Sequence, residues 1–396
     1  MGFLRSSARP LLCLCLLAPP ALAEGVIQSH SVDIAATYRA FAHEAASADD
    51  GADYRQAPGL QGEIDASGRI GDADFKLRLF GSWDAEDENR RYGDIRQASA
   101  LWRHDRLSFG AGVGTFFWGV SETINIVNVL NQADLRQAVD GKDKLGQSFT
   151  SLSLRFDTGE LSFYYLPTFR EREFSQRPSF GLPVSERAQF ETSEHGGDIA
   201  LRGQLYLGDL EVGLGYFNGT RRAPLLLRSS GTARELTPWY IETENLLLDT
   251  LYLVDDTILK LEVKTGRERD QGFFAANLGL EVPVYSLPEG LQDLSLIAEY
   301  LIDDRDEQAE SLGQNDLFIG LKSTFGDIGN SQFRGLVSYD FDSHANYLDL
   351  SLKHRLNDYV RIETRALLFL NARPEDSWLY PVRDEDFIEI KLHYSF

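Results

Sequence analysis

Apolar and polar residues alternate one by one along many segments of this chain, each about ten residues long. In one such segment Leu259, Leu261 and Val263 alternate with charged residues. Successive side chains of a β-strand point to opposite faces, so this pattern predicts strands with one apolar and one polar face. The 3.6-residue period of a helix does not fit. The same alternation occurs in 75–80, 210–217, 274–282 and 360–368.

Short turns follow every second predicted strand, and longer polar connections join the resulting pairs. Glycine, aspartate and asparagine suit such turns because they accept positive φ angles or bond to their own backbone. The arrangement predicts an all-β protein, a transmembrane antiparallel up-and-down β-barrel with short periplasmic turns and long external loops. We expect the turns at 71–72, 104–106, 157–159, 208–209, 255–256, 287–290, 325–330 and 357–358, and the loops at 42–59, 84–93, 115–147, 170–196, 219–243, 266–271, 303–315, 342–345 and 371–385.

These eight turns predict sixteen strands. A weaker alternation in 31–41 and the final segment 386–396 add two more. We therefore predict eighteen strands with both termini periplasmic, and sixteen strands is the alternative. The outward face is ambiguous in 94–103 and 244–254, where apolar residues fall on both faces.

A soluble β-sandwich would also show alternating strands. Two features favour a membrane instead. Charged residues stand in the middle of almost every strand on its polar face, and aromatic residues lie near strand ends, as in the interfacial girdles of membrane barrels. These aromatic residues are Trp83, Tyr164, Tyr165, Phe169, Tyr216, Tyr300, Tyr339, Tyr347 and Tyr394.

Residues 1–23 have the features of a secretory signal peptide: two arginines, a short apolar run and an Ala-Leu-Ala cleavage motif. Both cysteines lie inside it, so the predicted mature domain, 24–396, can form neither disulfides nor thiolate sites. The formal net charge of −22 argues against a nucleic-acid partner. No later segment is apolar enough for a membrane-spanning helix.

The last segment ends on a run of alternating apolar residues closed by Tyr394 and Phe396. In this it resembles the final strand of Gram-negative outer-membrane β-barrels. The resemblance implies a location in the cell outer membrane, contact with outer-membrane lipid and lipopolysaccharide, and recognition of Tyr394 and Phe396 by the barrel-insertion machinery.

The polar faces of the strands should form the wall of the lumen, and acids and bases are near balance there. The surplus acid lies in the runs 84–88, 303–307 and 384–386, which we expect on a solvated outer surface; a cation-attracting vestibule is the alternative. The acids lack the spacing of an EF-hand, so we expect no metal site. The predicted basic residues of the pore wall are Lys76, Arg78, Arg155, Arg202, Arg334, Lys353, Arg361 and Arg365.

The segment 115–147 is the longest loop and the most apolar one. We expect it to fold back against the barrel wall, bury its apolar residues and narrow the channel. Its apolar residues are Ile124, Ile126, Val127, Val129 and Leu130. The residues we expect at the constriction are Trp118, Glu122, Asn125, Asn128, Asn131, Asp134, Asp140, Lys142, Asp143 and Lys144.

The position of this loop is similar to the inward-folded third external loop of porins. Its sequence also resembles uncharacterised proteobacterial outer-membrane proteins related to porin-like and alginate-export-like barrels. The matching features are Trp118-Gly119, the Asn-rich stretch 125–131, and the Asp-Gly-x-Asp-Lys-Leu-Gly-Gln run at 140–147. Lys142 departs from that pattern, in which an acid is usual. The resemblance carries no substrate, and analogy with porins suggests a homotrimer.

These observations predict a channel for passive diffusion of small hydrophilic solutes, with loop 115–147 as its constriction. The alternative is a non-conducting barrel, plugged or braced by that loop, with an export, adhesion or structural role. The seven histidines and their serine neighbours form no nucleophile motif, and no phosphate loop is present. We therefore predict neither catalysis nor a cofactor.

Overall fold

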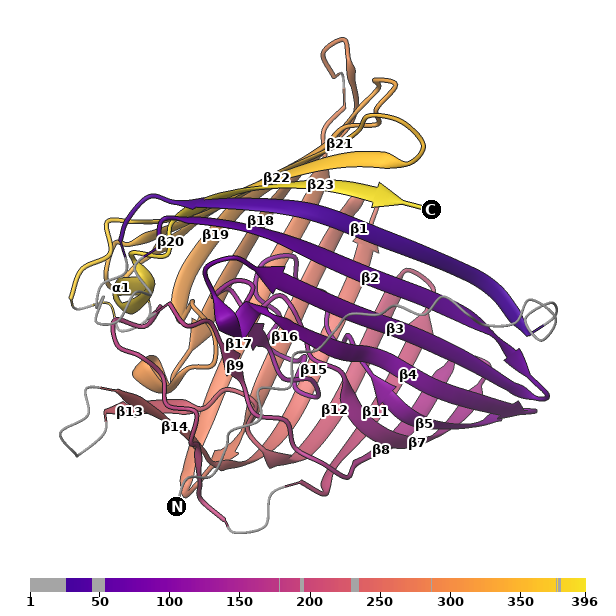
Figure 1. The fold of residues 1–396 in the computed structure, drawn as a ribbon. Coiled ribbons are helices and arrows are strands. Elements are labelled where there is room, and N and C mark those ends of the chain that lie inside the picture. The colour runs from indigo at the N-terminus through magenta and orange to yellow at the C-terminus, as the bar shows by residue number, and fades with distance from the viewer. Residues whose placement is uncertain are drawn as a thin grey trace, which may run out of the picture.

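The structure is a computed structural model that describes residues 26–44, 54–177, 179–192, 196–228, 235–285, 287–374, 376 and 379–396. Within these residues, eighteen strands form one antiparallel sheet (Figure 1). The sheet closes into a barrel because β1 (Ile27–Phe41) pairs with both β2 (Gln56–Ile70) and β23 (Phe387–Ser395). The predicted signal peptide lies outside the described residues.

Each strand of the barrel pairs with the strands before and after it, which gives the predicted up-and-down topology. The other barrel strands are β3 (Ala73–Asp84), β4 (Tyr92–His104), β5 (Leu107–Gly114), β7 (Gln147–Phe156), β8 (Gly159–Leu166), β11 (Asp198–Leu207), β12 (Leu210–Thr220), β15 (Glu242–Val254), β16 (Thr257–Glu268), β17 (Gln271–Pro283), β18 (Leu291–Asp303), β19 (Asn315–Phe325), β20 (Gln332–Asp340), β21 (Asn346–Arg355) and β22 (Val360–Leu370).

Short elements in the long loops complete the secondary structure. None of the helices among the described residues has the length and apolar character needed to span a membrane. The short strands are β6 (Asp134–Leu135), β9 (Glu173–Phe174), β10 (Gln189–Phe190), β13 (Leu225–Arg228) and β14 (Leu236–Tyr240), and the helical turns are η1 (Glu88–Arg90), η2 (Asp306–Gln308) and α1 (Leu379–Val382).

The prediction of eighteen strands is confirmed, and so are all eight short turns. These turns lie at the end of the barrel where β1 begins and β23 ends, which we call the short-turn end; the opposite end is the long-loop end. The predicted long connection at 266–271 is wrong. β16 and β17 extend to Glu268 and Gln271, so only a two-residue turn remains, with Arg269 at φ 56°.

The alternation of side chains separates an apolar outer surface from a polar lumen. On β17, Phe274, Leu278 and Leu280 are exposed on the outside, whereas Asn277 and Glu281 are buried on the inside. This is the face assignment that the sequence predicted. An outer surface of this kind is stable only where lipid or another apolar phase covers it.

The two ambiguous segments have separate causes. In β4 a bulge at Arg96 inserts one extra residue opposite β3. The residues that face outward therefore have odd numbers before the bulge and even numbers after it. In β15 the pattern is blurred because Leu247 faces the lumen and is buried there. Apolar residues can face the lumen where a loop covers them.

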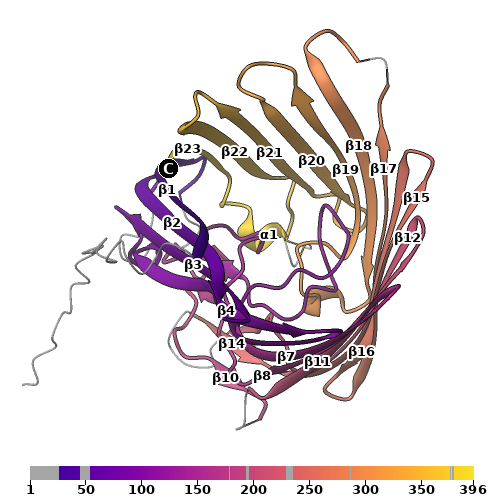
Figure 2. The same cartoon turned by 90° about the vertical axis from the view of Figure 1, so that its right-hand side faces the viewer.

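A hydrophobic cluster of buried residues lies inside the barrel, toward the long-loop end. Figure 2 shows part of the chain coiled within the ring of strands. Val127 and Leu130 of the longest loop are fully buried. They belong to the same cluster as Leu166, Phe217 and Leu247 on the inner wall. The core of this barrel is therefore a contact between several loops and the wall.

Candidate functional site

The loop between β5 and β7 crosses the lumen in two parts. It leaves the wall after Gly114 and returns at Gln147. We call residues 115–131 the first lobe and residues 132–146 the second lobe. The first lobe contacts β16, β17 and β18, and the second contacts β4, β21 and β22. Both lobes therefore lie inside the ring of strands (Figure 2).

Two acids of the wall hold the first lobe. Glu262 of β16 accepts hydrogen bonds from the backbone N–H groups of Val120 (2.7 Å), Ser121 (2.8 Å) and Ile126 (2.8 Å). Glu299 of β18 accepts bonds from the N–H groups of residues 122 (2.7 Å) and 123 (3.1 Å), and from the Thr123 hydroxyl. An irregular loop has unpaired N–H groups, and carboxylates satisfy them with strong, charge-assisted bonds.

Glu122 adds an ionic contact at the tip of this lobe. Its carboxylate lies 3.0 Å from Lys260 Nζ and 3.2 Å from Lys322 Nζ, and both lysines also pair with Glu281. Burial alone would raise the pKa of Glu122, but the two lysines lower it below its usual value. Arg334 donates from Nη2 to the Glu122 carbonyl (2.8 Å). The tip is therefore fixed to the wall by side-chain and backbone bonds.

The second lobe is held by ion pairs with the opposite part of the wall. Arg365 of β22 binds Asp140 of the lobe and Asp349 of β21, and Lys142 also binds Asp349. Arg365 lies 2.9 Å from Asp349 through Nε. Burial tends to raise the pKa of Asp140, and the charges of Arg365 and Lys142 lower it. Lys142 thus serves as an ionic anchor.

The asparagines of the first lobe act mainly on the loop itself. Asn125 Oδ1 accepts bonds from the N–H groups of Val127 (3.1 Å) and Asn128 (3.0 Å), which forms a local turn. Asn131 donates to the carbonyls of Gly114 (2.9 Å) and Leu145 (2.8 Å) and so ties the base of the loop together. The Asn-rich stretch therefore shapes the loop.

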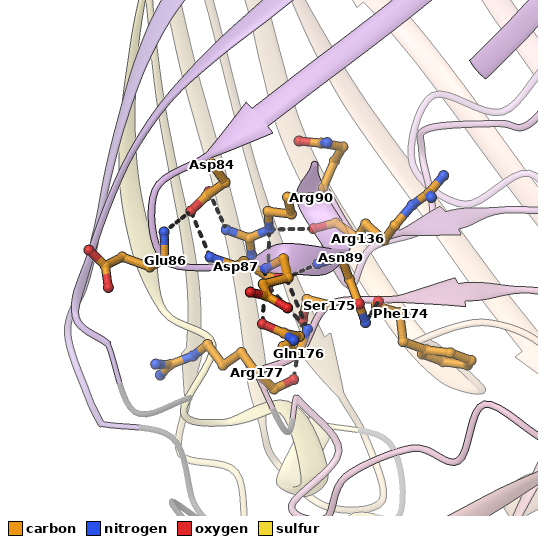
Figure 3. Close-up of polar contacts among 12 residues, drawn as sticks. Asp84, Glu86, Asp87, Asn89, Arg90, Arg136, Phe174, Ser175, Gln176 and Arg177 are labelled. Atoms are coloured by element: carbon orange, nitrogen blue, oxygen red, sulfur yellow. Dashed lines mark hydrogen bonds and ion pairs between the residues drawn. The ribbon is translucent and has the colours of Figure 1, made fainter. Parts of the chain in front are cut away.

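Other long loops brace the second lobe from the long-loop end. Arg90 of η1 donates from Nε to the carbonyl of Arg136 (2.7 Å) (Figure 3). Asp87 accepts bonds from the N–H groups of Asn89 (2.9 Å) and Gln176 (3.1 Å) (Figure 3). These bonds join three loops that are far apart in the sequence.

The prediction that the acidic runs are solvated holds only in part. Asp84 and Asp87 are buried beside Arg90, and Asp303 is buried beside Arg305 (2.6 Å). The arginines that neutralise these acids lie in the same loops, but composition does not show that they pair with these particular acids.

The loops and the wall together enclose a cavity of about 880 Å³. Its lining combines the tips of both lobes with the wall and with the loops at the long-loop end. Eight of the residues predicted for the constriction line it: Glu122, Asn125, Asn128, Asn131, Asp140, Lys142, Asp143 and Lys144.

Trp118 and Asp134, also predicted for the constriction, are absent from this lining. Trp118 is only 5% exposed; its ring contacts Tyr164 (centroids 5.9 Å apart) and lies beneath Arg202. Asp134 is buried between Arg96 (2.8 Å) and Arg136 (2.8 Å). Both residues are buried and stabilise the loop, and neither lines the passage.

The predicted wall bases divide into three groups. Arg202, Arg334 and Arg365 are engaged in the contacts beneath or against the loop. Arg78 lines the cavity and pairs with Asp65 (2.7 Å). The other four face the lumen closer to the short-turn end: Lys76 is exposed, and Arg155, Lys353 and Arg361 lie near Glu160, Glu363 and Asp33.

Sequence reasoning missed five arginines that line the cavity: Arg96, Arg172, Arg222, Arg228 and Arg305. Arg96 occupies the bulge of β4, where the strand pattern gave no clear face. The other four lie in long loops, which have no period from which an inward direction can be predicted.

Tyr394 and Phe396 lie on the outside of the barrel near the short-turn end, 50% and 57% exposed. Across the described residues, no group of three or more histidine, aspartate or glutamate side chains is arranged to hold a metal ion.

Comparisons with known proteins give a structural match only. No family model matches the chain, and no curated protein matches its sequence. Among solved structures, Pseudomonas aeruginosa OpdQ is similar at 12% identity, with 94% of this chain and 98% of that chain covered and a TM-score of 0.51.

Two further barrels overlap with this chain to a lesser degree. Pseudomonas putida OprB has 10% identity, coverage of 95% and 96%, and a TM-score of 0.49. A mutant of Rhodopseudomonas blastica porin has 10% identity, coverage of 93% and 99%, and a TM-score of 0.46. The chain therefore has a closed antiparallel barrel fold of the kind found in OpdQ.

Proposed function

We propose that this protein is an outer-membrane channel through which small solutes diffuse passively, with the loop 115–147 as its constriction. The observation that carries this proposal is the loop itself. It crosses the lumen and is fixed to the wall by Glu262 and Glu299, yet it leaves a cavity of about 880 Å³ lined by charged side chains. A fixed loop that narrows a wide barrel sets the size and charge of what passes.

The outer surface supports a membrane location. Exposed apolar residues such as Leu278 (61%) and Leu214 (53%) face outward from strands whose inner faces are polar. Eighteen strands form a barrel wide enough for an aqueous channel. The fold shared with OpdQ also supports a membrane location. In this orientation the short turns are periplasmic and the long loops external.

We extend the proposal to the partners of the barrel. Outer-membrane lipid would cover the apolar band, and lipopolysaccharide would contact the acidic long loops. The exposed Tyr394 and Phe396 would be read by the barrel-insertion machinery, and the assembly would be a homotrimer. The proposal includes no catalytic step.

The test is conductance of the purified full-length protein in planar bilayers. We expect stable single-channel steps whose size increases when residues 120–126 are replaced by a short glycine-serine linker. A plugged barrel with an export or structural role would instead be silent when intact and would conduct only after that replacement. Silence of both proteins, with the barrel folded by circular dichroism, would count against a channel altogether.

A further inference from the structure

A small sheet in the long loops forms part of the cavity lining. β6 pairs in parallel with β9, with Leu135 opposite Phe174. On the other side of the same segment, Ala133 forms an antiparallel bridge with Lys144. Two backbone bonds support this bridge, from Leu145 N to Gln132 O (2.9 Å) and from Asp134 N to Asp143 O (2.8 Å). We call this three-segment unit the loop sheet.

The register of the loop sheet places two cations on either side of one alanine. Lys144 stands opposite Ala133 on one side, and continuation of the β6–β9 register by one residue puts Arg172 opposite Ala133 on the other. Neighbouring strands are about 4.8 Å apart, so the backbones of the two cationic residues are separated by roughly 10 Å. Ala133, which stands between the two cations, also lines the cavity.

The next row of the same face is apolar. Side chains alternate between faces, so Leu135 and Phe174 lie on the face that carries Lys144 and Arg172. All of these residues line the cavity. Phe180 continues the apolar surface, since its ring packs edge-on against Phe174 with centroids 5.9 Å apart.

The two cations lack the carboxylate partners that their neighbours have. Arg172 donates from Nε to the neutral Gln132 side chain (3.0 Å), and within the described part of the chain neither Arg172 nor Lys144 has an ion pair. In the same lining, Lys142 pairs with Asp349 and Lys264 pairs with Glu310 (2.7 Å).

The titration behaviour of Lys144 agrees with a shortage of negative charge around it. Burial, and then the charge of Arg172, lower its pKa to about 8, although Asp140, Glu310 and Asp143 act in the opposite direction. Asp143 is adjacent in sequence, but alternation directs its side chain to the other face of the loop sheet. An anion bound between Lys144 and Arg172 would relieve the repulsion between these two cations.

We infer that the loop sheet is a binding site for an amphipathic anion, with a carboxylate or phosphate monoester between Lys144 and Arg172 and an apolar body over Leu135, Phe174 and Phe180. The inference rests on the proposed channel function and narrows its solute class. The sequence suggested small hydrophilic solutes, and this site would favour those that also carry an apolar part. Charge-assisted bonds from both cations would bind the anionic group.

Binding can be measured by calorimetric titration of the full-length protein in detergent, with hexanoate as the probe. We expect saturable binding of hexanoate, with acetate and the neutral hexanamide each at least tenfold weaker. Acetate lacks the apolar body, and hexanamide lacks the charge. Hexyl phosphate separates the two head groups, because tighter binding than hexanoate assigns the site to phosphate monoesters and weaker binding assigns it to carboxylates.

Variants of the two cations locate the site. Loss of one charged hydrogen bond should weaken hexanoate binding about tenfold in Lys144→Gln and in Arg172→Gln. Lys144→Arg and Arg172→Lys keep the charge and should retain most of the affinity. Lys353→Gln is the matched control, because it removes one lumenal positive charge near the short-turn end and should leave binding unchanged.

The site and the channel can fail separately. If hexanoate affinity is the same in wild type, Lys144→Gln and Arg172→Gln, or if acetate binds as well as hexanoate, the inference is overturned even when the protein conducts. If hexanoate binding depends on both cations but the protein forms no channel, the binding site stands and the proposed function is overturned.

Discussion

Replacing both acids that hold the first lobe, Glu262→Ala with Glu299→Ala, should release the loop from the wall. Six donors of the lobe bind these two carboxylates, five of them backbone N–H groups. Each charge-assisted bond contributes about 1.5–3 kcal/mol. Water in the lumen would satisfy part of the exposed donors, so we expect a net loss of about 5–9 kcal/mol.

Apolar contact opposes this release. Five apolar residues of the lobe pack against the wall or within the lobe: Ile124, Ile126, Val127, Val129 and Leu130. Burial contributes about 1.5–3 kcal/mol for each fully buried side chain, on the order of 10 kcal/mol together. A single substitution should therefore leave the lobe docked. The double substitution leaves the apolar contacts as the main offset to the conformational entropy of ordering the lobe, about 1–2 kcal/mol per residue, so the docked and released states become comparable in population.

Single-channel recording in planar bilayers tests this estimate. The double variant should show larger and noisier current steps than the wild type, with transitions between two levels. Glu262→Gln is the control, because it keeps an acceptor oxygen and should remain close to wild type. The heat-induced gel shift of the barrel should not change, since the strand pairing is intact. Unchanged step size and noise in the double variant would refute the reasoning.

Four further predictions follow from single residues. Leu130→Ala removes a fully buried side chain and should cost about 2–5 kcal/mol, seen as faster proteolysis within the first lobe of the folded barrel. Arg361→Glu should shift the reversal potential in a KCl gradient toward cation selectivity, and an unchanged potential would show that this side chain does not face the ion path. Raising the pH from 7 to 9 should also increase cation selectivity, because Lys144, with a pKa of about 8, loses its positive charge; Lys144→Gln should abolish this pH dependence. Arg39→Ala leaves Glu389 buried without the guanidinium that lies 2.7 Å from it where β1 meets β23. The free energy of unfolding should fall by about 3–5 kcal/mol, and the temperature of the gel shift should fall with it. Arg39→Lys should lower that temperature less.

The wall of the barrel could be predicted because strand geometry is local. Two-residue alternation in segments such as 259–264 fixes which side chains share a face, and turn residues such as Gly71-Asp72 mark where the chain reverses. Strand number and lumenal face therefore followed from residues close together in the sequence. The failures occurred where one residue interrupts the period, as Arg96 does, or where the turn is short enough for two strands to continue, as at Arg269.

The interior was less accessible to sequence reasoning. Apolar composition indicated that the loop folds inward, but it did not distinguish Trp118, which packs against the wall, from Glu122, which lines the cavity. Nor did it identify Arg172, whose place across Ala133 from Lys144 depends on pairing between two separate loops.

The amino-acid sequence by itself determined a closed cylinder with an apolar outside and a charged inside, because backbone alternation needs only neighbouring residues. Only the tertiary structure decided how the lumen is filled. Val120 meets Glu262 across 142 residues of chain, and Asp140 meets Arg365 across 225. Contacts at such separations are set by closure of the whole barrel, which brings opposite parts of its wall within reach of one loop.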